Sequence, residues 1–370
     1  MANFTTIDDP SAHFQVATWT GDGSTSDRNI ANDGNSDLAP DFIWGACRTD
    51  VQAKMLFDSS RGFSTGDKEL VSSYNNVEGD TSAYNTGAYG WLGPSITDGF
   101  VSNYGSVNNG YWNVSSRTYV AWQWKGAGGT TSTNNDGDIA STVQVNSTAG
   151  FSIVQYSPSN ATARSIGHGL GVKPQVVIVR ARNRVEDGRV FHRAAGTTGA
   201  LTLNSTATYN SNTNLFASDS TSTVFNVGTD FSVNGAYNYV AWCFAEIQGY
   251  SKFGSYKGNY QTSAPYNGPF VHCGFQPAFV MIKRSDSAND WIAFDHKRDE
   301  DQGGNVCNPY VRWNTTDAEV NHYYTGVDML SNGFKVRGYD GNANANGTYV
   351  YMAFAEHPFV TSTGVPNTAR

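Results

Sequence analysis

One short phrase recurs three times along the chain, and it constrains the fold more than any other feature of the sequence. The phrase is TYVAWQWKG at 118–126, NYVAWCFAE at 238–246 and TYVYMAFAE at 348–356. Other landmarks precede each copy in a fixed order. The chain is therefore expected to contain three copies of one structural unit.

The other landmarks are apolar runs and phenylalanines. One run opens at a proline in each copy (Pro40, Pro174 and Pro277), and a second run ends seventeen residues later in a phenylalanine (Phe57, Phe191 and Phe294). We also equate the phenylalanines of a first strand (Phe14, Phe151 and Phe253) and those that precede the recurring phrase (Phe100, Phe231 and Phe334). Units of about 100 residues are far longer than solenoid or propeller repeats, so the copies are predicted to be domains.

These landmarks set the predicted boundaries. They are an N-terminal arm at 1–13, repeat 1 at 14–129, a linker at 130–150, repeat 2 at 151–249, repeat 3 at 250–359 and a C-terminal tail at 360–370. The linker is rich in Gly, Ser, Thr and Asn, which is typical of a flexible linker or an extended hairpin.

Composition and periodicity indicate strands. The chain has 39 glycines and is 13% aromatic and only 15% charged, which suits pleated, half-buried strands joined by tight turns. In the first copy of the phrase, alternation places Tyr119, Ala121 and Gln123 on one face of a strand, and Val120, Trp122 and Trp124 on the other. The run VVIV at 176–179 is continuously apolar, as expected of a strand covered on both faces. We predict an all-β fold of three tandem, antiparallel, β-sandwich-like domains related by internal repetition, with a β-barrel as the alternative.

Charge and cysteine content exclude several classes of protein. The formal net charge is −8 and basic residues do not cluster, which argues against a nucleic-acid partner. No run of 18 apolar residues and no secretory signal pattern occurs, so neither membrane insertion nor export by that route is predicted. The four cysteines (Cys47, Cys243, Cys273 and Cys307) lack the spacing of a zinc or redox site, and Cys243 is predicted to be a buried free thiol. This usage favours a reducing cytoplasm.

No group of residues predicts a catalytic site. Asp58 and Asp295 follow the second-run phenylalanine in repeats 1 and 3, but repeat 2 has His192 at this position. We therefore interpret all three residues as polar strand ends. Glu246 and Glu356 end the recurring phrase, and they could do acid–base chemistry only by meeting across two domains. We favour a structural role for these carboxylates at a joint between domains and do not predict an enzyme. A polysaccharide depolymerase is the catalytic alternative.

Three loops have the composition of a calcium site. They are NDGNSD at 32–37, NNDGDI at 134–139 and YDGNANANG at 339–347. Their oxygen-rich side chains suit Ca²⁺, but none has the full spacing of a calcium loop, and the same residues are typical of hairpin turns. We therefore predict no cofactor or metal.

Aromatic residues in Gly/Asn-rich loops are the candidate contact residues. An aromatic platform beside amides can stack on a pyranose ring and hydrogen-bond its hydroxyls. The alternative is that these side chains pack beneath their loops or against a neighbouring subunit. The candidates for a glycan or partner contact are Tyr89, Trp91, Tyr111, Trp112, Tyr323 and Tyr324.

The wording of the recurring segments resembles a known group of proteins. GHGLGVKPQVVIVR, NYVAWCFAEIQGYSKFGSYKGN, GFQPAFVMIKR, LSNGFKV and TYVYMAFAEHPF are similar to a domain of structural proteins from marine tailed bacteriophages, including cyanophages, usually labelled as tail-fibre or virion proteins. The resemblance covers 151–359 closely and 14–129 through the looser first repeat. It supplies no binding or catalytic residues.

This resemblance implies a structural protein of the phage particle, on the tail, baseplate or fibre, that is assembled in the cytoplasm of a bacterial host. Its partners would be other virion proteins and further copies of itself, with a trimer favoured, and a host surface glycan is a further candidate. The alternatives are a carbohydrate-binding module and a protein that decorates the capsid surface.

Overall fold

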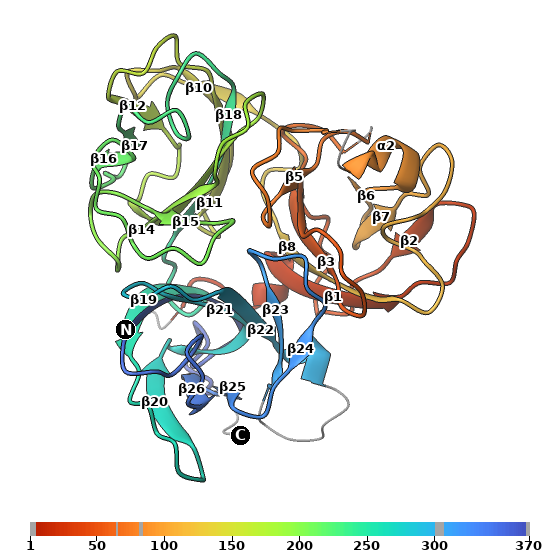
Figure 1. Cartoon of the computed structure of the whole chain (residues 1–370), viewed down its shortest axis with the longest axis vertical. Coiled ribbons are helices and arrows are strands. Elements are labelled where there is room, and N and C mark those ends of the chain that lie inside the picture. Colours follow the sequence, from red (N-terminus) through yellow and green to blue (C-terminus); the bar gives the residue numbers. More distant parts are fainter. Residues whose placement is uncertain (1–4, 64–65, 81–83, 300–306, 368–370) are drawn as a thin grey trace.

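The computed structural model describes residues 5–63, 66–80, 84–299 and 307–367. This part of the chain is almost entirely β, and every pairing between its named strands is antiparallel. Three units lie around a common centre, and each pairs a large sheet with a sheet of three strands (Figure 1). The predicted all-β, β-sandwich-like architecture is confirmed.

The described residues of unit 1 form ten short elements. They are η1 (Pro10–Ala12), β1 (Phe14–Thr20), β2 (Arg28–Ile30), β3 (Phe42–Cys47), β4 (Met55–Asp58), β5 (Leu70–Val71), α2 (Thr86–Tyr89), β6 (Leu92–Ser95), β7 (Phe100–Ser102) and β8 (Thr118–Trp124). The large sheet has the order β1-β8-β3-β4-β5, and the small sheet has the order β2-β7-β6.

Unit 2 contains strands only. They are β9 (Ser132–Asn134), β10 (Ser141–Asn146), β11 (Phe151–Tyr156), β12 (Arg164–Gly167), β13 (Pro174–Ala181), β14 (Arg189–His192), β15 (Leu201–Thr202), β16 (Phe216–Ser218), β17 (Val224–Val227) and β18 (Tyr239–Ala245). The large sheet has the order β9-β10-β11-β18-β13-β14-β15, and the small sheet has the order β12-β17-β16.

Within its described residues, unit 3 has nine strands and one short helix. They are β19 (Ser251–Lys257), β20 (Asn267–His272), β21 (Phe275–Arg284), β22 (Trp291–Asp295), η2 (His296–Asp299), β23 (Pro309–Arg312), β24 (Val320–Asn321), β25 (Thr325–Leu330), β26 (Gly333–Gly338) and β27 (Thr348–Pro358). The large sheet has the order β19-β27-β21-β22-β23-β24, and the small sheet has the order β20-β26-β25.

Corresponding strands occupy corresponding places in the three units. In each large sheet the strand of the recurring phrase lies between the first strand and the proline run, and the second run follows. The first and closing strands also stack one aromatic pair in every unit, with ring centroids 5.1–5.2 Å apart: Trp19 on Tyr119, Tyr156 on Tyr239 and Tyr256 on Tyr349. Sequence landmarks and strand topology thus describe the same unit three times.

Two of the predicted equivalences between phenylalanines are wrong, those of Phe231 and Phe253. The pairing of β17 with β12 sets Phe225, which is buried, opposite Ile166, as Phe100 is set opposite Ile30 in unit 1. Phe231 lies in the following turn and is 47% exposed. In unit 3 the residue at the position of Phe14 is Ser251 and not Phe253. Ser251 pairs with Phe354, and Phe14 pairs with Trp124, which occupies the same position of the recurring phrase.

The segment at 130–150 is mostly a hairpin. Its strands β9 and β10 extend the large sheet of unit 2, with β10 paired along the whole of β11. The hairpin form of the predicted linker is therefore the one found, and the boundary of unit 2 moves towards residue 130.

The central strands of the large sheets are buried on both faces, as the apolar run at 176–179 predicts. Val177 and Val179 belong to the core between the two sheets of unit 2, whereas Val176 and Ile178 belong to a core that all three units share. The recurring phrase divides in the same way: Tyr119 and Ala121 face the core of unit 1, and Val120, Trp122 and Trp124 face the shared core.

Three aromatic rings meet at the middle of the shared core, and all three come from the same position of the recurring phrase. The centroids of Trp124, Phe244 and Phe354 are 6.0, 5.9 and 5.5 Å apart, and each pair is edge-to-face. Such geometry adds to the area that the rings bury. The recurring phrase is thus the strand that carries the centre of the molecule.

The two ends of the described chain pack onto this body. Ile7 reaches the shared core, and the Thr5 hydroxyl donates to the carbonyl of Gln248 over 3.1 Å. The backbone N–H of Ser362 donates to the Asp8 carboxylate over 2.7 Å. The predicted N-terminal arm and C-terminal tail therefore touch each other beside unit 3 (Figure 1).

Candidate functional site

The three units dock in a closed head-to-tail ring through equivalent backbone hydrogen bonds. A loop of unit 1 meets unit 2, a loop of unit 2 meets unit 3, and a loop of unit 3 meets unit 1. The first bond of each joint is Glu78 N to Arg182 O (2.7 Å), Tyr209 N to Ser285 O (2.9 Å) and Glu319 N to Arg48 O (2.7 Å). A second is Glu186 N to Asn75 O (3.2 Å), Asn289 N to Thr206 O (3.0 Å) and Gln52 N to Thr316 O (2.8 Å).

A buried ion network fixes the joint between units 1 and 2. Asp58 accepts from Arg61 Nε over 2.6 Å and from Trp242 Nε1 of unit 2 over 3.2 Å. Glu78 bridges Arg61, at 3.1 Å, and Arg182 of unit 2, at 2.7 Å. Burial opposes the charge on Arg61, but Asp58 and Glu78 outweigh it and raise the pKa of the guanidinium.

The same network fixes the joint between units 3 and 1. Asp295 accepts from Arg298 Nε over 2.6 Å and from Trp122 Nε1 of unit 1 over 3.0 Å. Glu319 bridges Arg298, at 2.8 Å, and Arg48 of unit 1, at 3.0 Å. Removing one member of such a network would leave a buried charge without its partner.

The joint between units 2 and 3 has a neutral arrangement instead. His192 stands where the other joints have aspartate, and Met352 where they have tryptophan. Burial lowers the pKa of His192 to about 4, so the ring is neutral, and its Nε2–H donates to the Tyr351 carbonyl over 3.1 Å. Asp58, His192 and Asp295 are polar strand ends as predicted, and each secures a joint.

A buried cation crosses each joint and donates to a backbone carbonyl of the preceding unit in the ring. Lys54 bonds Asp317 O (2.7 Å), Arg180 bonds Val71 O (2.7 Å) and Lys283 bonds Thr206 O (3.2 Å). Burial lowers the pKa of Lys54 and of Lys283 to about 8, and that of Arg180 to about 10.

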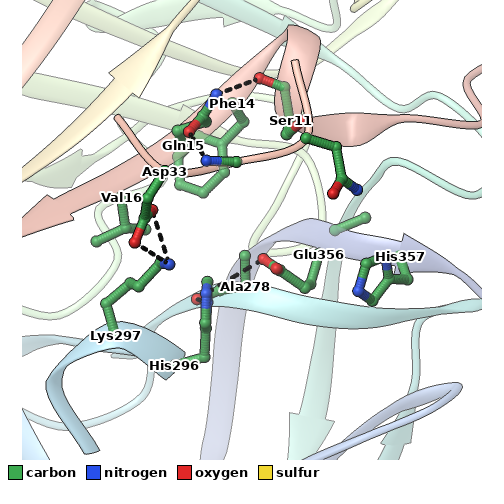
Figure 2. A pocket seen from close by; sticks show the side chains of 13 residues that line it. Ser11, Phe14, Gln15, Val16, Asp33, Ala278, His296, Lys297, Glu356 and His357 are labelled. Carbon is green, nitrogen blue, oxygen red and sulfur yellow. Dashed lines mark hydrogen bonds and ion pairs between the residues drawn. The ribbon is translucent and has the colours of Figure 1, made fainter. Parts of the chain in front are cut away.

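A small pocket of about 150 Å³ lies between units 1 and 3 (Figure 2). His296 Nε2 lies 3.3 Å from Glu356 Oε2, and Lys297 Nζ lies 2.8 Å from the Asp33 carboxylate. The first pair lies within unit 3, and the second joins unit 3 to unit 1. The chemistry of the pocket is that of a contact between units.

The carboxylates that end the recurring phrase do not meet. Glu356 lies in the pocket of Figure 2, whereas Glu246 lines another pocket beside Lys252, whose Nζ is 2.5 Å away. A paired-carboxylate mechanism has no geometric support from them.

The aromatic candidates of unit 1 are mostly core residues. Trp112 is fully buried, against Phe57 and Tyr119, so its prediction as a contact residue is wrong. Trp91 and Tyr111 pack on the same core, and Trp91 Nε1 donates to the carbonyl of Phe63 over 2.8 Å. Tyr89 is 40% exposed and remains a surface candidate.

The two candidates of unit 3 belong to a larger group on the surface, which we call the tyrosine cluster. Tyr323 is 69% exposed, and its ring lies 5.1 Å from that of Tyr324. The sequence did not point to Tyr260, Tyr266 and Tyr339, whose rings pack on these two or on each other. A pocket of about 350 Å³ opens at this cluster; it is lined by Ala264, Pro265, Tyr266, Asn308, Tyr323, Arg337 and Gly338.

Within the part of the chain that the structure describes, no three His, Cys, Asp or Glu side chains gather as a metal site would require. The loop residues that suggested calcium bond to protein groups instead: Asp138 accepts from Ser165, and Asp340 from the backbone of Asn342. All four cysteines are buried, and no disulfide joins them. None of the described helices has the length and apolar character to cross a bilayer.

Comparison with known proteins gives one match. The family described as "Domain of unknown function (DUF7483)" matches residues 9–358. The chain belongs to this family. The match spans all three units, as the shared core does. No curated protein and no solved structure matches the chain.

Proposed function

We propose that this protein is a non-enzymatic structural component of a bacteriophage virion, on the tail, baseplate or fibre, and that it serves assembly and host attachment. The observation that carries the proposal is the closed ring of units around one core. Buried bonds at every joint favour a rigid block over a string of mobile binding modules. The resemblance of the recurring segments to marine phage proteins supports the assignment to a virion.

The proposed partners are other virion proteins and further copies of this chain. Contacts that close a three-membered ring already lie within one chain. A homotrimer, favoured by the sequence analysis, would therefore be built through the outward-facing surfaces of the units. Mass photometry of the purified full chain measures the copy number directly.

Purified particles of a phage that encodes this chain provide the test. Quantitative mass spectrometry should find the protein in fixed proportion to the major capsid protein, and cryo-electron microscopy should show a three-lobed density at a symmetric position. Particles that contain the capsid and tail proteins but lack this chain would overturn the proposal.

A further inference from the structure

Two rings of the tyrosine cluster stand in a loop where the other two units have no aromatic residue. Each unit has a loop between the first strand of its large sheet and the first strand of its small sheet, at 21–27, 157–163 and 258–266. The loops of units 1 and 2 contain no aromatic residue, whereas that of unit 3 contains Tyr260 and Tyr266. Because the same architecture forms twice without an aromatic residue in this loop, Tyr260 and Tyr266 are not required to form the fold.

The cluster forms a corner that faces solvent. The rings of Tyr266 and Tyr323 are 5.6 Å apart and almost perpendicular, at 89°. Tyr266 also contacts Tyr324 and Tyr339, at 5.6 and 5.8 Å, and is held in place by them. Tyr323, at 69% exposure, has no such support on its outer face. The corner therefore offers one exposed ring face beside a fixed ring.

Polar groups converge on the same pocket. Asn308 lines the pocket, which brings its side-chain amide within reach of a ligand hydroxyl; its Oδ1 is buried and finds no hydrogen-bond donor among the described residues. Arg337 also lines the pocket, but its guanidinium pairs with Asp328 over 2.6 Å and donates to Asn267 Oδ1 over 2.8 Å. Its charge is thus compensated, which favours a neutral ligand over an anion.

We propose that the tyrosine cluster is a saccharide site, in which a neutral pyranose ring stacks on Tyr323 and hydrogen-bonds Asn308. The inference rests on the proposed function, because it names the site and the ligand class of host attachment. The pocket volume of about 350 Å³ lies near the lower limit for small-molecule sites, about 300 Å³. It suits one or two sugar rings better than a protein partner, which would need a contact of about 800 Å² on each side.

Saturation-transfer NMR on the full chain tests this site with the methyl glycosides of glucose, galactose, mannose and N-acetylglucosamine. At least one should receive saturation on its ring C–H protons. Tyr323→Ala should weaken that binding by about tenfold or more. Tyr89→Ala, which removes an exposed tyrosine of unit 1, is the matched control and should leave it unchanged.

Two further variants separate stacking from general apolar contact and guard against misfolding. Tyr323→Trp keeps an aromatic face and should retain binding, while Tyr323→Leu keeps apolar volume and should lose it. Binding of none of the four glycosides would overturn the inference, as would unchanged binding in a folded Tyr323→Ala. Density of another virion protein over Tyr323 would assign the cluster to protein contact, so the saccharide site would fail while the virion role stood. If the chain binds a saccharide but is absent from particles, the saccharide site stands and the virion role fails.

Discussion

Asp58, His192 and Asp295 occupy one position in three units, yet they secure their joints by different chemistry. Each aspartate is buried with an arginine and accepts from a tryptophan of the next unit. His192 is neutral and makes one bond to a backbone carbonyl. The free energy that each residue contributes should therefore differ, although the position is the same.

We expect Asp58→Ala and Asp295→Ala to destabilise the protein by about 3–5 kcal/mol each at pH 7, because each leaves a buried arginine without its partner. His192→Ala should cost less, about 1–3 kcal/mol, since it removes one neutral hydrogen bond. Denaturant unfolding of the three variants measures this order. Equal losses at all three positions would mean that the ion networks contribute no more than the histidine.

Glu69 makes stability depend on pH. It is 1% exposed, accepts from the Thr86 hydroxyl over 2.6 Å, and burial raises its pKa to about 7 from 4.5. The folded state therefore binds the proton more tightly than the unfolded state, and this contribution to stability is full below pH 4.5 and lost as pH rises through 7. His192, with its lowered pKa, has the opposite effect and loses stability as pH falls from 6.5 towards 4.

Glu69→Gln isolates the first effect. The variant should gain up to roughly 3 kcal/mol over the parent at pH 8, and the gain should vanish near pH 4.5. Thermal unfolding of both proteins from pH 4.5 to 8 measures the difference, in which the histidine contributions cancel. A gap that does not change with pH would show that Glu69 is ionised throughout.

Single residues were hard to place from the sequence. Trp112 stands in a Gly/Asn-rich loop, which suggested exposure, but it is buried against Phe57 and Tyr119. Phe231 lies at the spacing expected from Phe100, but Phe225 is the residue whose strand pairing is equivalent to that of Phe100. Loop composition and spacing do not report which side chains a loop folds beneath it.

At the scale of elements, the sequence identified strands and their faces well. Alternation in the recurring phrase correctly divided Val120, Trp122 and Trp124 from Tyr119 and Ala121. The composition of 130–150 left a flexible linker and an extended hairpin open. The hairpin forms because β10 pairs along β11. Sequence periodicity predicts which faces of a strand are covered, but not which element covers them.

The joints between elements make a prediction that concerns three positions together. His192→Asp alone should destabilise by about 3–5 kcal/mol, because the buried carboxylate would lack both arginine and tryptophan. Adding Ala195→Arg and Met352→Trp rebuilds the pattern of Asp58, Arg61 and Trp242, and should recover part of that loss.

Denaturant unfolding of the single, double and triple variants gives the coupling free energy, which should be at least about 1 kcal/mol in the favourable direction. Met352→Trp by itself serves as the control for overpacking of the shared core. Additive losses would contradict the equivalence of the three joints.

At the scale of the molecule, the sequence predicted three domains in tandem, but the shared core joins them. Trp124, Phe244 and Phe354 meet there although they are more than one hundred residues apart in sequence. A repeated phrase reveals equivalent strands, and it does not reveal that their outer faces pack on one another.

This arrangement predicts cooperative unfolding. Separate domains would melt independently, as multi-domain proteins commonly do, whereas loss of any unit here exposes the apolar faces of the other two large sheets. Differential scanning calorimetry of the full chain should therefore give one transition with a calorimetric enthalpy close to the van't Hoff enthalpy.

Phe244→Ala, in the shared core, should lower the midpoint without splitting the transition. Phe225→Ala, in the core of unit 2 alone, is the matched control and should behave alike. Resolved transitions in the parent protein, or a separate melting of unit 2 in the control, would show that the shared core does not couple the units.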